Sequence, residues 1–142
     1  MKHECCELFR IIPKEEIKKV FKGAAAAELD YTFLAFEEIY KSVLNFVPKG
    51  KTIIDLGCAY APQAYYFTEY SKYIGVDVFV PDIHFTTANM TLYQMSAQQF
   101  CKKVIDEKWD LDNCFAICSY VPDVIARKCV RETFPNCLAY YP

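Results

Sequence analysis

The chain has 142 residues, of which 54% are hydrophobic, 16% aromatic and 24% charged. This length predicts a single domain, residues 1–142, and the apolar share excludes a disordered chain because it suffices for a packed core. Sixteen Lys and Arg against eighteen Asp and Glu give a net charge of −2, and no more than two basic residues are adjacent. The sequence therefore lacks the clustered basic surface of a nucleic-acid-binding domain.

The apolar runs are all short. None approaches the roughly 18 residues that a membrane-spanning helix needs. The first residues, Met-Lys-His-Glu-Cys-Cys, lack the apolar segment of a signal peptide. We therefore expect no membrane partner and a cytoplasmic location.

The eight cysteines show no C-x2-C spacing, which zinc ribbons and redox motifs use. Several lie in apolar stretches, where a free cysteine behaves as a small hydrophobic side chain. We interpret them as thiols and expect no metal. A site built from His3, Cys5 and Cys6 is the alternative, although adjacent cysteines in an extended chain point in opposite directions.

The N-terminal part, residues 1–48, is predicted to be helical. Pro13 precedes three charged residues and is typical of a helix start, and Gly23 ends or weakens that helix. A second helix is expected over residues 28–46, where apolar side chains recur at intervals of three and four. Pro48 stops it.

The part from residue 51 to residue 142 alternates between strand and helix patterns. Strands are expected at residues 52–56, 73–78, 90–94, 114–118 and 136–141, and helices at 62–70, 97–107 and 124–134. In the helix at 97–107, Phe100, Val104 and Ile105 are expected to face inward. This alternation predicts a three-layer α/β domain with a mostly parallel sheet of about five strands, preceded by N-terminal helices.

Two acidic residues mark the expected ligand site. In an open parallel sheet, ligands bind at the carboxyl ends of the strands, most often after the first one. Asp55 ends the first predicted strand and Gly57 follows it, whereas Asp77 ends the second strand. A carboxylate in the position of Asp77 can accept hydrogen bonds from both hydroxyls of a ribose.

These segments resemble class I S-adenosylmethionine-dependent methyltransferases. Residues 47–58 (VPKGKTIIDLGC) are similar to the start of that family's nucleoside-binding motif, and residues 73–77 (YIGVD) to its second strand. Residues 94–97 (QMSA) fall where the family has a polar and a small residue beside the adenine. The resemblance runs from about Leu29 to the last residue and implies a Rossmann-like fold with S-adenosylmethionine as cofactor.

The resemblance implies a cofactor site made of Asp55, Gly57, Cys58, Ala59, Asp77, Val78, Ser96 and Ala97. Gly57 would let the backbone approach the methionine moiety, Asp77 would hold the ribose and Val78 would pack against the adenine. Asp55 would orient the loop or contact the methionine ammonium. The alternative for Ser96 is that it only caps the next helix.

The chain departs from the family in the loop after the first strand. Ala59 and Ala61 stand where the family has two further glycines. Alanine resists a positive φ, at a cost of about 1–2 kcal/mol where that conformation is required. The two alanines are therefore expected to strain the loop that would contact the cofactor.

The segment after the fourth predicted strand departs too. Many amino-group methyltransferases have Asp/Asn-Pro-Pro-aromatic there, whereas residues 119–123 are SYVPD. Ser119 and Tyr120 are candidates for the substrate side, no catalytic residue is assigned, and Asp123 is expected to cap the following helix.

The family's sheet has seven strands, against five predicted here. The fifth is expected to be an exposed edge near residues 136–142, where a homodimer or another protein would pair. The first functional hypothesis is a small methyltransferase. The alternative is a catalytically inactive methyltransferase-like interaction or regulatory module, and another nucleotide is a third option for the ligand.

Overall fold

The computed structural model describes residues 39–80, 84–119 and 121–140. Five strands form one sheet in the order β3-β2-β1-β4-β5, and every pairing is parallel. The chain adds β2 and β3 on one side of β1 and then crosses to add β4 and β5 on the other. The strands are β1 (Thr52–Leu56), β2 (Lys72–Asp77), β3 (Met90–Gln94), β4 (Cys114–Ser119) and β5 (Cys137–Tyr140).

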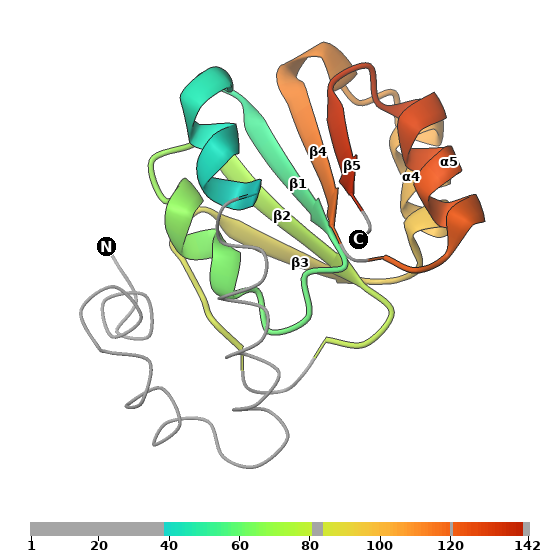
Figure 1. Cartoon of the computed structure of the whole chain (residues 1–142), viewed down its shortest axis with the longest axis horizontal. Helices are drawn as coiled ribbons and strands as arrows, with labels where there is room; N and C mark the ends of the chain where they lie inside the picture. The colour runs from blue at the N-terminus through green and yellow to red at the C-terminus, as the bar shows by residue number, and fades with distance from the viewer. Residues whose placement is uncertain (1–38, 81–83, 120, 141–142) are drawn as a thin grey trace.

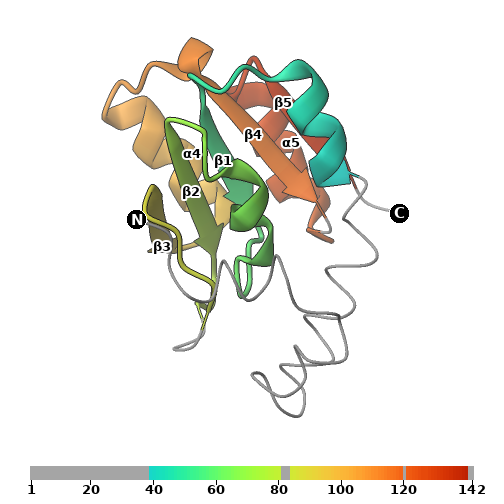
Figure 2. The ribbon, with the colours of Figure 1, turned by 90° about the vertical axis from the view of Figure 1, so that its left-hand side faces the viewer.

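Helices cover both faces of this sheet (Figures 1 and 2). The helix at residues 39–46 and the 3-10 helix η1 (Pro62–Phe67) pack on one face. The helices α4 (Ala97–Asp106) and α5 (Val124–Thr133) pack on the other, and the short η2 (Leu111–Asn113) precedes β4. The α/β class and the parallel five-stranded sheet are thus confirmed, in a Rossmann-like three-layer arrangement. The expected helix before Gly23 lies outside the described residues.

The central strand β1 shows why both faces of the sheet must be packed by helices. All five residues of β1 are buried, as expected for a strand between two helical layers. Because side chains alternate along a strand, Ile53 enters the core under the helix at 39–46, whereas Ile54 enters the core under α4 and α5. β5 lies at one edge of the sheet and β3 at the other.

The core between the sheet and the helices α4 and α5, called the second core below, is built around Phe100. The Phe100 side chain, on α4, is fully buried. Its ring stacks with Phe134 at a centroid distance of 6.4 Å and meets Trp109 edge-on at 5.6 Å. Val104 is buried one turn further on, but Ile105 is 57% exposed, so the expectation that Ile105 faces inward is wrong. Each residue turns the helix by about 100°, which carries Ile105 off the face that Phe100 and Val104 share.

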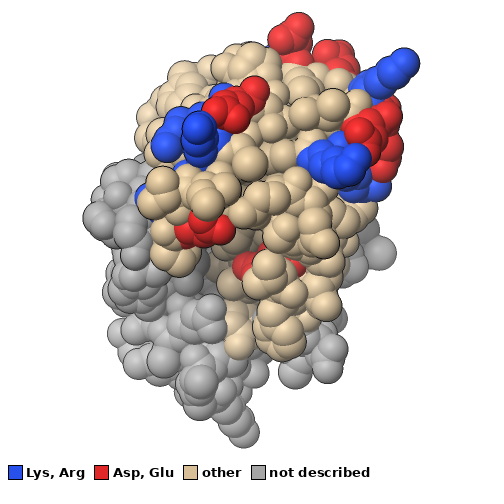
Figure 3. All heavy atoms as spheres, turned by 90° about the vertical axis from the view of Figure 1, so that its right-hand side faces the viewer, with Lys and Arg blue, Asp and Glu red and all other residues tan. Residues whose placement is uncertain are grey.

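The outer surfaces of α4 and α5 carry charges of both signs, visible as neighbouring blue and red groups in Figure 3. Lys102–Asp106, Lys103–Glu107 and Lys128–Glu132 are ion pairs at i, i+4 spacing, and such exposed pairs add little stability. In the described part of the chain, we find no helix of the length and apolarity needed to cross a membrane.

Replacing Phe100 with alanine should lower the free energy of unfolding by about 3–5 kcal/mol, because it empties the centre of the second core. Ile105→Ala on the same helix is the matched control and should change stability by less than about 1 kcal/mol. Urea denaturation of both variants measures the difference. Equal losses would contradict the assigned core.

Candidate functional site

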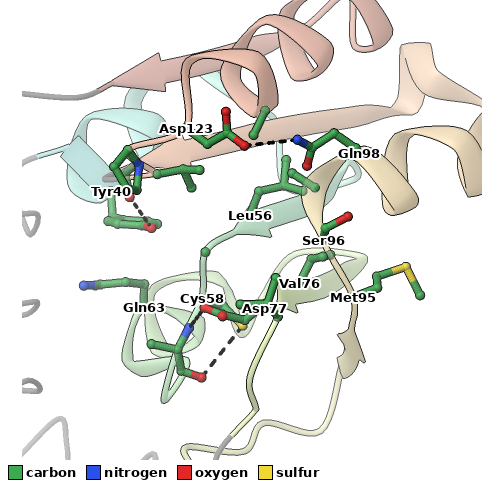
Figure 4. A pocket seen from close by; sticks show the side chains of 18 residues that line it. Tyr40, Leu56, Cys58, Gln63, Val76, Asp77, Met95, Ser96, Gln98 and Asp123 are labelled. Atoms are coloured by element: carbon green, nitrogen blue, oxygen red, sulfur yellow. Dashed lines mark hydrogen bonds between the residues drawn. The ribbon is translucent and has the colours of Figure 1, made fainter.

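A cavity of about 700 Å³ opens at the carboxyl ends of β1, β2 and β4. This is where the sheet's strand order reverses, the usual place for a ligand in such folds. In Figure 4, Tyr40 and Asp123 lie on one side, Asp77 and Cys58 on the other, and Leu56 between them. The lining residues are Tyr40, Leu56, Gly57, Cys58, Ala59, Gln63, Val76, Asp77, Val78, Met95, Ser96, Ala97, Gln98, Ser119, Val121, Pro122, Asp123 and Ala126.

The loop after β1 is tied to the end of β2. The N–H groups of Gly57 and Cys58 both donate to the Val76 carbonyl, at 2.7 and 3.2 Å. The Ala59 N–H donates to one carboxylate oxygen of Asp77 at 2.9 Å, and the Phe79 N–H to the other at 3.1 Å. A carboxylate has about four lone-pair sites, so the half-buried Asp77 keeps accepting capacity on the cavity side.

This loop takes the conformation that glycine favours, although it contains two alanines. The φ angles are 86° at Gly57, 47° at Ala59 and 56° at Ala61. Both alanines are therefore in the left-handed region, and the strain expected from the sequence is present in the folded chain. At Gly57, a side chain would also collide with Val121, because its Cβ would lie 2.9 Å from Val121 Cγ2.

A buried carboxylate lies beneath the cavity. Asp55 is fully buried and does not line the cavity. The Tyr40 hydroxyl donates to Asp55 Oδ1 at 2.7 Å, and the Tyr73 hydroxyl donates to Oδ2. Tyr40 also shares a hydrogen bond of 2.7 Å with Ser119 Oγ. This network joins the helix at 39–46 to β1, β2 and β4.

Burial raises the pKa of Asp55 from its ordinary value of 3.8 to about 6, and the nearby Asp77 charge adds to the rise. The hydrogen bonds from Tyr73 and Tyr40 oppose it. Burial, with Asp55 and Asp77 close by, also raises the pKa of the Cys58 thiol far above its usual range. The Cys58 thiol is therefore protonated at neutral pH and is not poised as a nucleophile.

The side of the cavity next to β2 and β3 is formed by apolar and small groups. Val78 is 69% exposed at the rim, whereas Met95 and Ala97 are half-buried. The expected helix-capping role of Ser96 is confirmed, because its hydroxyl accepts the Gln99 N–H at 3.1 Å and the Gln99 side chain accepts the Ser96 N–H in return.

The side of the cavity next to β4 contains Ser119, Val121, Pro122 and Ala126, with Asp123 at the rim. Asp123 caps α5 as expected, accepting the Ile125 N–H at 2.9 Å. It also accepts a bond from the Gln98 side chain at 3.1 Å, which joins the two helices across the cavity rim. The second substrate-side candidate, Tyr120, lies outside the described residues.

The structure gathers most of the predicted residues around one cavity. Of the expected cofactor residues, only Asp55 does not line it; Gly57, Cys58, Ala59, Asp77, Val78, Ser96 and Ala97 do, together with Ser119. Sequence reasoning missed several lining residues, among them Tyr40, Gln63 and Gln98. Tyr40 follows the apolar period of its helix, so its pattern signalled only a core position.

Within residues 39–80, 84–119 and 121–140, no group of three His, Cys, Asp or Glu side chains could hold a metal ion. The six cysteines of these segments are free thiols, and the alternative site at His3, Cys5 and Cys6 lies outside them.

Comparison of the chain with protein-family models, with curated proteins and with solved structures gave no match.

Ala59→Gly should raise the free energy of unfolding by about 1 kcal/mol, because glycine takes a positive φ without strain. Ala61→Gly should be nearly neutral, since Ala61 is fully buried and losing its methyl group offsets the gain. Thermal and urea unfolding of both variants measure this contrast. Destabilisation by Ala59→Gly would show that the loop is not strained there.

The pH dependence of stability should contain a contribution from Asp55. Folding raises the pKa of Asp55, so protonation of this carboxyl group stabilises the folded chain. This stabilisation is complete below about pH 4 and is lost as the pH rises through about 6. The full effect corresponds to roughly 3 kcal/mol. A neutral asparagine amide can both donate and accept between the two tyrosines, so Asp55→Asn should remove this slope. Parallel slopes for the two proteins would contradict the assignment.

Proposed function

We propose that the chain binds S-adenosylmethionine in this cavity and is a small methyltransferase. One observation carries the proposal: the Asp77 carboxylate at the end of β2 holds the Gly57 loop, and both line a single cavity that continues to Ser119 at the end of β4. That arrangement provides a nucleoside side and an acceptor side in one space. The volume of about 700 Å³ is typical of small-molecule sites.

The residues present fit this cofactor. Asp77 would accept hydrogen bonds from the ribose hydroxyls, and Val78, Met95 and Ala97 would contact the adenine. The Gly57 loop would lie along the methionine moiety. When bound, the cofactor supplies an electrophilic methyl group on a positively charged sulfur. The chain's part in transfer is chiefly to position the acceptor, so no covalent intermediate with the protein is needed.

The same geometry argues against ligands that carry phosphates. Phosphate sites in α/β folds use free N–H groups after the first strand and at the next helix start. Here Gly57, Cys58 and Ala59 already donate to Val76 and Asp77, and the next helix begins with Pro62, which has no N–H. This favours a nucleoside without phosphate over a dinucleotide.

The charge of the lining supports the same choice. Asp77 and Asp123 line the cavity, and the lining residues that the structure describes include no Lys, Arg or His. In Figure 3, the Lys and Arg side chains of the described residues lie in the upper part of the view, and the charged groups visible among the described atoms below them are those of Asp and Glu. Carboxylates attract a positively charged ligand and repel phosphate.

A binding module without catalytic activity is the second candidate. The strained alanines at 59 and 61 favour it, because they occupy the loop that would contact the methionine moiety. β5, at the edge of the sheet, is where such a module would pair with a second copy or another protein. Cofactor binding without methyl transfer to any acceptor would favour this candidate.

Asp77→Asn should weaken the binding of S-adenosylmethionine by about tenfold or more, because the ribose loses a charged acceptor. Calorimetric titration measures the affinity. Asp106→Asn is the matched control: it removes the same charge from the exposed end of α4 and should leave the affinity unchanged. Equal affinities for wild type and Asp77→Asn would contradict the proposed site.

A further inference from the structure

Three buried oxygen-bearing side chains connect the acceptor side of the cavity to the centre of the sheet. Ser119 and Tyr40 line the cavity, and their side-chain oxygens are 2.7 Å apart. The Tyr40 hydroxyl is also 2.7 Å from Asp55 Oδ1. The exposed fractions of Ser119, Tyr40 and Asp55 are 5%, 2% and 0%. The chain of hydrogen bonds therefore starts at the cavity and ends on a group that solvent does not reach.

The direction of these bonds is set by the proton on Asp55. An ionised carboxylate only accepts, so the Tyr40 proton must point at Asp55, and Ser119 must then donate its single proton to the Tyr40 oxygen. Ser119 is left with lone pairs only. In this state it can accept a hydrogen bond from a molecule in the cavity but cannot donate one.

Protonation of Asp55 allows the opposite direction. Asp55 then donates to Tyr40, Tyr40 donates to Ser119, and the Ser119 proton is free to point into the cavity. Burial places the change near neutral pH, since the pKa of Asp55 is raised to about 6. Burial and the adjacent Asp55 also raise the pKa of Tyr40, so Tyr40 passes a proton on without becoming ionised at rest.

We propose that Ser119, Tyr40 and Asp55 form a proton wire, and that the cavity beside Ser119 takes the O–H or N–H group of an otherwise apolar molecule. In the transfer, the bond from the acceptor's oxygen or nitrogen to its hydrogen breaks, and that proton binds Ser119 Oγ. The Ser119 proton moves to Tyr40, and the Tyr40 proton to Asp55 Oδ1. The electron pair stays on the acceptor atom, which becomes the nucleophile.

The surroundings favour an apolar body for this molecule. Leu56, Val121, Pro122 and Ala126 line the cavity around the β4 end. The proposal rests on the proposed function in taking this molecule as the methyl acceptor. The wire itself is a property of the protein alone, so it can be tested without the cofactor.

The other groups around Asp55 do not offer a second path to the cavity. Tyr73 on β2 donates to Asp55 but is fully buried and does not line the cavity. Besides burial, the Asp77 charge raises the pKa of Asp55. Burial and the Asp55 charge in turn raise the pKa of the Cys58 and Cys118 thiols, which therefore stay protonated. This makes Tyr73 a matched control for Tyr40, because both donate a phenolic hydroxyl to the same carboxylate and only Tyr40 also reaches Ser119.

The experiment compares phenol with anisole, two neutral ligands of which only phenol can donate a hydrogen bond. Their affinities are measured by NMR titration at about pH 5 and about pH 7.5, where phenol stays un-ionised. Shifts of the Val121 and Ala126 amides locate the site. We expect the phenol-to-anisole affinity ratio to rise roughly two- to tenfold at the higher pH, when Asp55 is ionised and Ser119 only accepts.

Tyr40→Phe should abolish this rise, whereas Tyr73→Phe should keep it with a shifted midpoint. Ser119→Ala cuts the wire at the cavity end and should also abolish the rise, which covers the case of poorly folded Tyr40→Phe. The same pH dependence in Tyr40→Phe and Tyr73→Phe, or no shift of Val121 and Ala126 at millimolar phenol, would overturn the proposal. Failure to bind S-adenosylmethionine would instead contradict the proposed function and leave this ratio unaffected.

Discussion

The hydrogen bonds to Asp55 hold together the elements on which the cavity depends. Asp55 is on the central strand, and through Tyr40, Tyr73 and Ser119 it is linked to a helix, to β2 and to β4. A fully buried carboxylate is costly unless it is hydrogen-bonded, so each tyrosine hydroxyl is needed where it is. The β4 side of the cavity is thus positioned by a group that lies below its surface.

The β2 side is organised by a second carboxylate with a different environment. Asp77 is half-buried, accepts the Ala59 and Phe79 N–H groups and still faces the cavity. Its bond to Ala59 holds the loop in a conformation that alanine disfavours. The loop is therefore strained in the folded protein, and strain of this kind is often found where a protein binds a ligand.

The sequence predicts the sheet well because burial shows in its pattern. Short apolar runs locate most of the strands, and the strand ends bring Asp77, Gly57 and Ser119 to one edge. The position of Asp55 under the cavity could not be predicted, because a strand pattern does not say which side chains cover each face. The partner, Tyr40, looks like any apolar position of an amphipathic helix. Such pairings depend on tertiary contacts that are 15 or more residues apart in the chain.

The central claim is that the cavity takes an adenine nucleoside without phosphate, held by Asp77. It is tested most directly by calorimetric titration of the wild-type protein with S-adenosylhomocysteine and, separately, with NAD. The account predicts micromolar binding of S-adenosylhomocysteine and no measurable binding of NAD. Tighter binding of NAD, or binding of neither ligand at millimolar concentration, would contradict it.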